Sequence, residues 1–161
     1  MYIGSLLNIK IYIMVMPTIN YLAIIVAGLI PSIVGAIYYG PLLGKVWRDS
    51  LGKTEEELQP SNPALAYGGS MLLSIFLASS LNFTIGLVHK DVNEAGELFI
   101  NSSFSFGHGA LHGAMIGLTI LMPVIVSLGI FHKLSWKTNI LNAIFWIICA
   151  AIMGGILDVW Q

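Results

Sequence analysis

Four long apolar stretches occupy most of this chain, and each has about the length that an α-helix needs to cross a lipid bilayer. They cover residues 19–39, 64–88, 104–131 and 138–159. A hydrocarbon core of ~30 Å requires about 20 helical residues at a rise of 1.5 Å each. Charged residues make up only 9% of the chain, whereas a soluble domain carries about 25%. The sequence therefore predicts an all-α integral membrane protein, a four-helix transmembrane bundle.

Composition also limits the partners and the chemistry of the chain. The net charge of -1 leaves no basic patch that could follow a phosphate backbone, so no nucleic acid partner is expected. The single cysteine, Cys149, cannot form an intrachain disulfide or a multi-cysteine metal site. We expect it to be a small buried hydrophobic residue. The predicted partner is the lipid bilayer, and we expect no cofactor and no catalytic activity.

The segment before the first span has an unusual composition. Residues 1–15 are apolar, but Pro17 separates them from the span, and Met16 offers a second possible start. The segment carries only Lys10 as a positive charge and lacks a cleavage site after a short apolar core, unlike a signal peptide. We expect an N-terminal extension or a start-site artefact there, followed by a single transmembrane domain over residues 16–161.

The basic residues predict which way the bundle faces. Four spans place both termini and the second loop on one side, which carries only Lys10 and Lys90. The other side carries five basic residues in the first and third loops, namely Lys45, Arg48, Lys53, Lys133 and Lys137. Because Lys and Arg accumulate on the cytoplasmic side, we expect loops one and three to be cytoplasmic and both termini to lie outside.

The first loop has the pattern of a short amphipathic helix. After Pro41, which we place in its first turn, apolar residues recur on one helical face opposite the charged ones. Trp47 lies on the apolar face as an interfacial anchor, and Gly52 is expected to end the helix. Thr54 and Glu57 then have the spacing of a capping box.

Aromatic residues also mark the cytoplasmic boundary of the spans. Tyr38, Tyr39 and Trp136 are predicted interfacial anchors together with Trp47. Asn142 lies on the fourth span and is expected to face the Tyr-Tyr-Gly-Pro turn. In the second loop, on the opposite side, three acidic residues would share one face if the segment were helical; they are Asp91, Glu94 and Glu97. We interpret this loop as a solvated outer loop.

The third span carries three glycines with a spacing of four residues, Gly109, Gly113 and Gly117. In lipid, helices associate through close packing of small residues, so this face predicts a helix contact. The pattern does not distinguish a helix of the same chain from a second copy, and we expect a homo-oligomer through this span. Pro31 and Pro123 lie within the first and third spans and are expected to kink them.

Several of these segments resemble one known family. The block Gly-Ala-Ile-Tyr-Tyr-Gly-Pro-Leu-Leu-Gly-Lys-Val-Trp covers residues 35–47. It is accompanied by Met-Pro-Thr-Ile-Asn-Tyr-Leu at residues 16–22, Thr-Glu-Glu-Glu at residues 54–57, His112-Gly113, and Ser-Trp-Lys at residues 135–137 through Asn142 and Trp146. From residue 16 to residue 160 the chain is similar to the bacterial membrane family catalogued as domain of unknown function 1761. The resemblance implies a four-helix protein of the bacterial inner membrane and assigns no activity, cofactor or catalytic residue.

Polar residues inside the spans are the best indication of function, because they must find partners or line a cavity in lipid. His108 and His112 lie one turn apart on the third span, on the same narrow arc as Ser105 and Thr119. Other spans carry polar residues at comparable depth, namely Asn20, Asn82 and Asp158. We predict that His108, His112 and these three converge in the outer leaflet, with Asp158 pairing with a histidine.

Three functions fit this polar cluster. The residues can be a binding site for a small solute, an ion or a proton in a protein that moves it. They can instead be interhelical hydrogen bonds that specify packing in a structural or assembly subunit. The third is a metal or haem site on His-x-x-x-His, although the sequence places no third ligand by motif. We favour the first function and assign neither a metal nor a reaction.

Overall fold

The computed structural model describes residues 19–88, 90–92, 98–100 and 105–160 of the chain. Its elements in chain order are α1 (Tyr21–Ile37), η1 (Tyr38–Leu42), α2 (Gly44–Leu51), α3 (Pro63–Val88), β1 (Lys90–Val92), β2 (Leu98–Ile100), α4 (Phe106–Ile116), η2 (Gly117–Leu121), α5 (Met122–Phe131) and α6 (Trp136–Val159). The segments η1 and η2 are single π-helical turns, and α4, η2 and α5 together form one continuous span.

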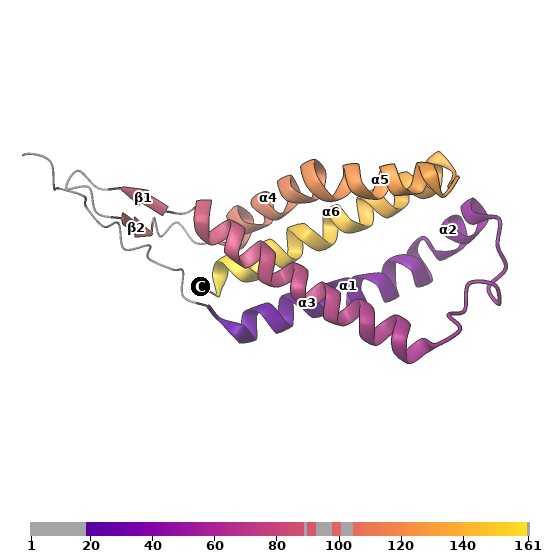
Figure 1. Cartoon of the computed structure of the whole chain (residues 1–161), viewed down its shortest axis with the longest axis horizontal. Coiled ribbons are helices and arrows are strands. Elements are labelled where there is room, and N and C mark those ends of the chain that lie inside the picture. The colour runs from indigo at the N-terminus through magenta and orange to yellow at the C-terminus, as the bar shows by residue number, and fades with distance from the viewer. Residues whose placement is uncertain (1–18, 89, 93–97, 101–104, 161) are drawn as a thin grey trace, which may run out of the picture.

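Four helices are long and apolar enough to cross a membrane, and they confirm the predicted fold. They cover Tyr21–Leu42, Pro63–Val88, Phe106–Phe131 and Trp136–Val159. The start of the first span lies beside the end of the last span, where Nδ2 of Asn20 donates a hydrogen bond to the carbonyl oxygen of Trp160 at 2.8 Å. This end of the bundle also holds the end of α3 and the β-hairpin (Figure 1).

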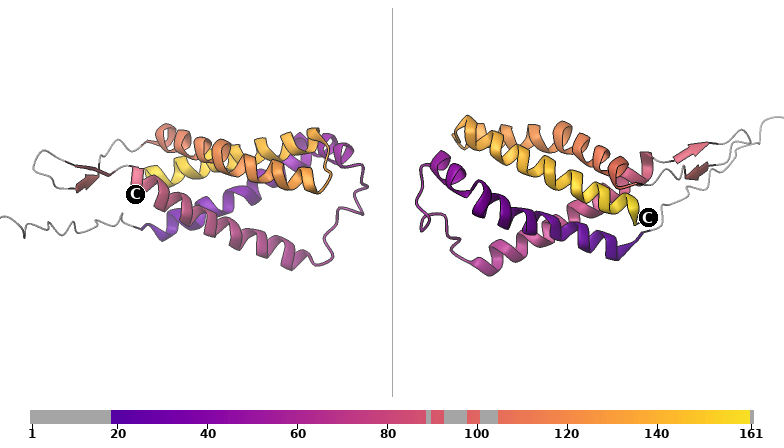
Figure 2. Two further views of the ribbon diagram at one scale, coloured as in Figure 1. Left: turned by 45° about the horizontal axis from the view of Figure 1, so that its top comes forward. Right: turned by 180° about the vertical axis from the view of Figure 1, so that it is seen from behind.

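The last helix, α6, is the centre of the bundle. Half of its most apolar part is buried (50%), compared with 33% for each of the first two spans and 11% for the third. It contacts α1, α2, α3, α4 and α5. Both views in Figure 2 show it between the α4–α5 span and the α1–α3 pair. The buried face of α6 is therefore where the other spans meet.

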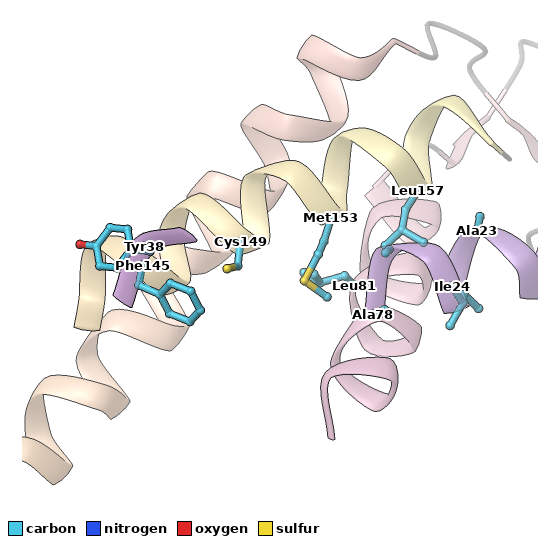
Figure 3. Packing of buried hydrophobic residues seen from close by; sticks show 10 residues of the cluster. Ala23, Ile24, Tyr38, Ala78, Leu81, Phe145, Cys149, Met153 and Leu157 are labelled. Atoms are coloured by element: carbon cyan, nitrogen blue, oxygen red, sulfur yellow. The ribbon is translucent and has the colours of Figure 1, made fainter. Parts of the chain in front are cut away.

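Small residues let α1 and α3 approach α6 in the core. Ala23 and Ala27 on α1 and Ala78 on α3 are fully buried beside Met153 and Leu157 of α6 (Figure 3). Cys149 is buried in the same cluster, as predicted. The buried residues of α3 begin at Ser74, so the part of the helix before it turns away from the core.

The glycine face of the third span packs against α6. A Cβ atom on Gly113 would overlap the carbonyl oxygen of Ala150, and one on Gly109 would overlap Gly154 and Asp158. A Cβ on Gly117 would lie 2.9 Å from Cα of Ile147. The contact is therefore backbone against backbone, within one chain. The glycine face through which a homo-oligomer was predicted thus packs within the chain, and association with a second copy through this span stays a prediction.

The break between α1 and α2 lies at η1 and corrects one prediction. Gly40 has a non-helical backbone (φ -98°, ψ -112°), and Pro41 disfavours the α-helical region for the residue that precedes it. Pro41 therefore lies in the break, and α2 begins only at Gly44. At the other end, Gly52 adopts a left-handed conformation (φ 65°) and ends α2 as predicted.

The predicted capping box after α2 is confirmed. The backbone N–H of Thr54 donates to Oε2 of Glu57 at 2.8 Å, and the backbone N–H of Glu57 donates to Oγ1 of Thr54 at 3.3 Å. These reciprocal bonds fix the turn that leads the chain back toward α3.

The two prolines within the spans have different surroundings. The helix α1 continues through Pro31 without a break. Pro123 is the second residue of α5, directly after the π-helical turn η2 and inside the continuous span. A π-helical turn adds a residue to the helix at this point.

The second loop contains a short antiparallel pair of strands instead of a helix. In this pair Lys90 lies opposite Ile100, and Asp91 lies opposite Phe99. Asp91 is therefore in a strand and not on a helical face. The other two, Glu94 and Glu97, lie outside the described residues.

At the α2 end of the bundle, the predicted boundary aromatics pack on α6. Tyr38 is buried (4% exposed), and its hydroxyl donates to the carbonyl oxygen of Leu141 at 3.0 Å. Oδ1 of Asn142 accepts from the hydroxyl of Tyr39 at 3.0 Å and from Nε1 of Trp47 at 3.1 Å. These three aromatics therefore join η1 and α2 to α6; Tyr39 and Trp47 remain half-buried, and their role as interfacial anchors stays a prediction. The fourth predicted anchor, Trp136, is 67% exposed.

Hydroxyl groups make a second link between α2 and α6. The carbonyl oxygen of Ser50, near the end of α2, accepts from Oγ of Ser135 at 3.1 Å and from Oγ1 of Thr138 at 3.0 Å. Ser135 also caps α6, because its Oγ accepts from the backbone N–H of Thr138. The amphipathic helix is thus fixed to the start of α6.

We expect Gly113→Leu to lower the free energy of unfolding by about 1–3 kcal/mol or more, because the added side chain meets backbone atoms that cannot repack. The measurement is unfolding in detergent micelles. Gly107→Leu is the matched control on the same helix, since a Cβ there meets no described atom within 4 Å. Equal stability of the two variants would show that α4 and α6 are not in backbone contact.

We expect Asn142→Leu to destabilise the α2 end of the bundle. The substitution removes the acceptor of both Tyr39 and Trp47, and an unsatisfied buried donor costs about 1–3 kcal/mol. A double-mutant cycle with Tyr39→Phe should show coupling, because the two side chains share one hydrogen bond. Trp136→Phe, at an exposed position, is the control and should leave stability unchanged. Additive effects of the two substitutions would contradict this account.

Candidate functional site

The start of α4 is built around a carboxylate of α6. Ser105 precedes the helix with an extended backbone, and its Oγ accepts from the backbone N–H of His108 at 3.2 Å. This N-cap leaves the backbone N–H of Ser105 directed at Asp158, to which it donates at 3.1 Å (Oδ2). The cap therefore both starts α4 and binds the carboxylate.

Asp158 is fully buried, in the last turn of α6. It can lie against α4 because Gly109 has no side chain there, and a Cβ on Gly109 would overlap the Cβ of Asp158. The carboxylate also lies at the N-terminal end of α4, where the helix dipole favours negative charge. Gly109 thus makes room for the Asp158 side chain and lets its carboxylate lie at the start of α4, where the helix dipole stabilises it.

Two histidines extend this cluster along α4. Nδ1 of His108 lies 3.4 Å from Oδ2 of Asp158, which is an ion-pair distance when the imidazole is protonated. Nε2 of His108 lies 3.2 Å from Nε2 of His112, so one of these nitrogens donates to the other. The two rings are nearly perpendicular, at 87°, with centroids 4.6 Å apart. The three side chains form a continuous line from α6 to the second turn of α4.

The geometry restricts where protons can be. If neutral His108 directs its Nδ1–H at the carboxylate, its Nε2 is an acceptor, and His112 must donate from Nε2. If His108 is charged, it donates from both nitrogens and the Nε2 of His112 accepts. Both protonation states therefore satisfy the same contacts, with the shared proton in a different place.

Exposure differs sharply along this line. The side chain of His108 is 36% exposed, and that of Asp158 is 0% exposed. His112 is half-buried, about 9 Å along the helix axis from the start of α4 at 1.5 Å per residue. The partly exposed imidazole of His108 thus lies directly against the buried carboxylate of Asp158.

The structure brings together only part of the predicted site. His108, His112 and Asp158 are in contact, and Asn20 lies near them at the end of α6 through its bond to Trp160. Asn82 is buried on α3 (5% exposed), but the bonds between α4 and α6 described above do not include it. Thr119 is exposed, and its hydroxyl donates to the carbonyl oxygen of Met115 on its own helix.

Two contributions to the site were not predicted from the sequence. The backbone N–H of Ser105 binds Asp158, although the serine itself, three residues before His108, is a recognisable N-cap signal. Gly109 was predicted to pack helices, but it also admits the carboxylate to the helix start. Within the described residues, no group of three or more His, Cys, Asp or Glu side chains is arranged to hold a metal ion.

Comparison with known families gives one match. The family model described as "Protein of unknown function (DUF1761)" matches residues 22–158, which include the four spans and end at the buried aspartate. Comparisons with curated proteins and with solved structures find no match. With nearly the whole helical bundle matched, the chain belongs to the DUF1761 family of proteins of unknown function.

Proposed function

We propose that this multi-pass membrane protein is not an enzyme and reversibly binds a proton at the line His112–His108–Asp158. The predicted orientation places this line in the outer leaflet, near the side of the two termini. The proton is the smallest of the ligands that the sequence suggested, which were a small solute, an ion or a proton. The observation that supports this proposal best is the distance of 3.2 Å between Nε2 of His108 and Nε2 of His112, next to the buried carboxylate of Asp158.

The contacts support a complete proton transfer. In the starting state, His108 directs Nδ1–H at the Asp158 carboxylate, and His112 donates its Nε2–H to Nε2 of His108. A proton delivered to Nδ1 of His112 makes this ring cationic, and its Nε2 proton then passes to His108. The result is a neutral His112 and a His108 imidazolium paired with Asp158. One proton has entered, and the net charge of the site has risen by one.

The free-energy cost of burying Asp158 in the membrane favours a proton-binding role over a packing role alone. A charged residue inside a membrane costs on the order of 3 kcal/mol, so such residues are typically functional. Asn or Ser could accept the bond from Ser105 with a smaller desolvation cost. The carboxylate adds the ability to stabilise a charged imidazole, which a neutral side chain lacks.

A purely structural role is the second candidate, favoured by one observation. The bond from Ser105 to Asp158 ties α4 to α6 and would contribute to packing whether or not the histidines bind a proton. The two functions differ in what happens to the histidines when the carboxylate is removed.

We expect Asp158→Asn to weaken proton binding at this line, because Nδ1 of His108 loses the carboxylate that lies 3.4 Å away. The measurement is NMR of ¹⁵N-labelled imidazoles, which reports whether each ring carries one proton or two. His132, exposed at the opposite end of the bundle, is the internal reference and should give the same signals in both proteins. Asp49→Asn removes an exposed carboxylate on α2 and is the matched control.

A structural site gives a different result. In that case Asp158→Asn lowers stability while the protonation of His108 and His112 stays the same as in the wild type. That outcome would contradict proton binding at this line and leave helix packing as its role.

A further inference from the structure

An apolar groove separates α5 from α6 on the outside of the bundle. It has a volume of about 580 Å³ and is lined on one side by Pro123 and Val126 of α5. The other side is formed by residues of α6 that recur on one helical face, including Trp136, Ile140 and Ile147. Ser127 is exposed at the edge of the groove and contributes a hydroxyl.

Two close contacts join the third span to α6 along the groove. Gly117 approaches the backbone of Ile147, at the end of the groove far from the α5–α6 turn. Gly129 approaches the side chain of Asn139 so closely that a Cβ would overlap it, and the lining continues past this contact to Ile130 and Trp136. The groove thus lies along a helix pair that these two contacts hold together.

The groove has the length of one leaflet. From Trp136 to Ile147 it spans eleven residue steps, or about 16 Å at 1.5 Å each. This is about half of a hydrocarbon core of ~30 Å. Trp136 is 67% exposed and lies at the end of its span, as tryptophans at the headgroup level do. The groove therefore runs from the headgroup level to the middle of the membrane.

Two cations flank the headgroup end of the groove. Lys137 is exposed and follows Trp136 directly, and Lys133 is exposed in the turn between α5 and α6. Lys133 has a left-handed backbone (φ 56°), at a helix end where glycine is the favoured residue. The turn is closed by the backbone N–H of Leu134, which donates to the carbonyl oxygen of Gly129 at 2.8 Å. A lysine in this position is unfavourable for the backbone, which indicates that its charge has a use.

We propose that the groove binds an anionic phospholipid from the leaflet on the side of the α5–α6 turn. One acyl chain lies between α5 and α6, and the phosphate pairs with Lys133 and Lys137. The apolar lining matches the chain, the length matches one leaflet, and the two cations match the negative headgroup. The proposal concerns the opposite end of the bundle from the histidine cluster and does not depend on it.

The test is native mass spectrometry of the delipidated full chain after titration with dioleoyl phosphatidylglycerol or dioleoyl phosphatidylcholine. We expect one phosphatidylglycerol to be retained more strongly than phosphatidylcholine. The double variant Lys133→Gly/Lys137→Gln should lower the affinity for phosphatidylglycerol by roughly 10- to 30-fold, the effect of two basic residues near a headgroup. Because glycine suits the left-handed position, this variant should fold at least as well as the wild type.

Two further variants make the result specific. Lys45→Gln/Lys53→Gln removes two exposed charges at the same end of the bundle but on α2 and its following turn, and should leave the affinity unchanged. Ser127→Trp fills the groove from an exposed position and should reduce retention of both lipids. Equal affinity for the two lipids, or equal losses in the two double-lysine variants, would overturn the anionic lipid site. A dimer that forms without lipid and is abolished by Ser127→Trp would show that a second copy occupies the groove instead.

Discussion

The rest of this structure depends on the contact between α4 and α6, where glycines bring two backbones together. In lipid, burying apolar surface between helices gains little, so the bundle needs close van der Waals contact. Gly113 against Ala150 and Gly109 against Gly154 provide it. The same approach places the start of α4 against the end of α6. The candidate site is therefore a direct consequence of the packing, and its distances are set by atoms that cannot move apart without opening the bundle.

The fold could be predicted from the sequence because four apolar stretches of bilayer length allow few alternatives. The partner of the glycine face could not, since small residues at a spacing of four mark a contact without naming its other side. The position of Pro41 was wrong for a similar reason. A proline in the first turn of a helix and one in a break look alike in sequence, and here the backbone of Gly40 decides between them.

The site could be predicted in part, from depth and helical spacing. His108, His112 and Asp158 lie at similar depth on two spans, and the structure brings them together. Thr119 shares their arc on a regular helix, but its hydroxyl bonds to Met115 of its own helix. The aromatic residues show another contact that the sequence alone could not predict. Tyr39 and Trp47 have the composition of lipid-facing anchors, but Asn142 offers one oxygen that accepts from both and draws them onto α6.

The position of Asp158 links protonation to the geometry of the helix ends. A carboxylate in the last turn of α6 is disfavoured by the dipole of its own helix. It is stabilised by the opposite end of another dipole, the start of α4, and by the adjacent imidazole of His108. A proton on His108 would place a positive charge 3.4 Å from this carboxylate. The backbone contact between Gly113 and Ala150, one turn further along α4, involves no charged group. The proposed proton binding therefore concerns the first turn of α4 and the last turn of α6, and it does not involve the glycine contact that holds the two helices together.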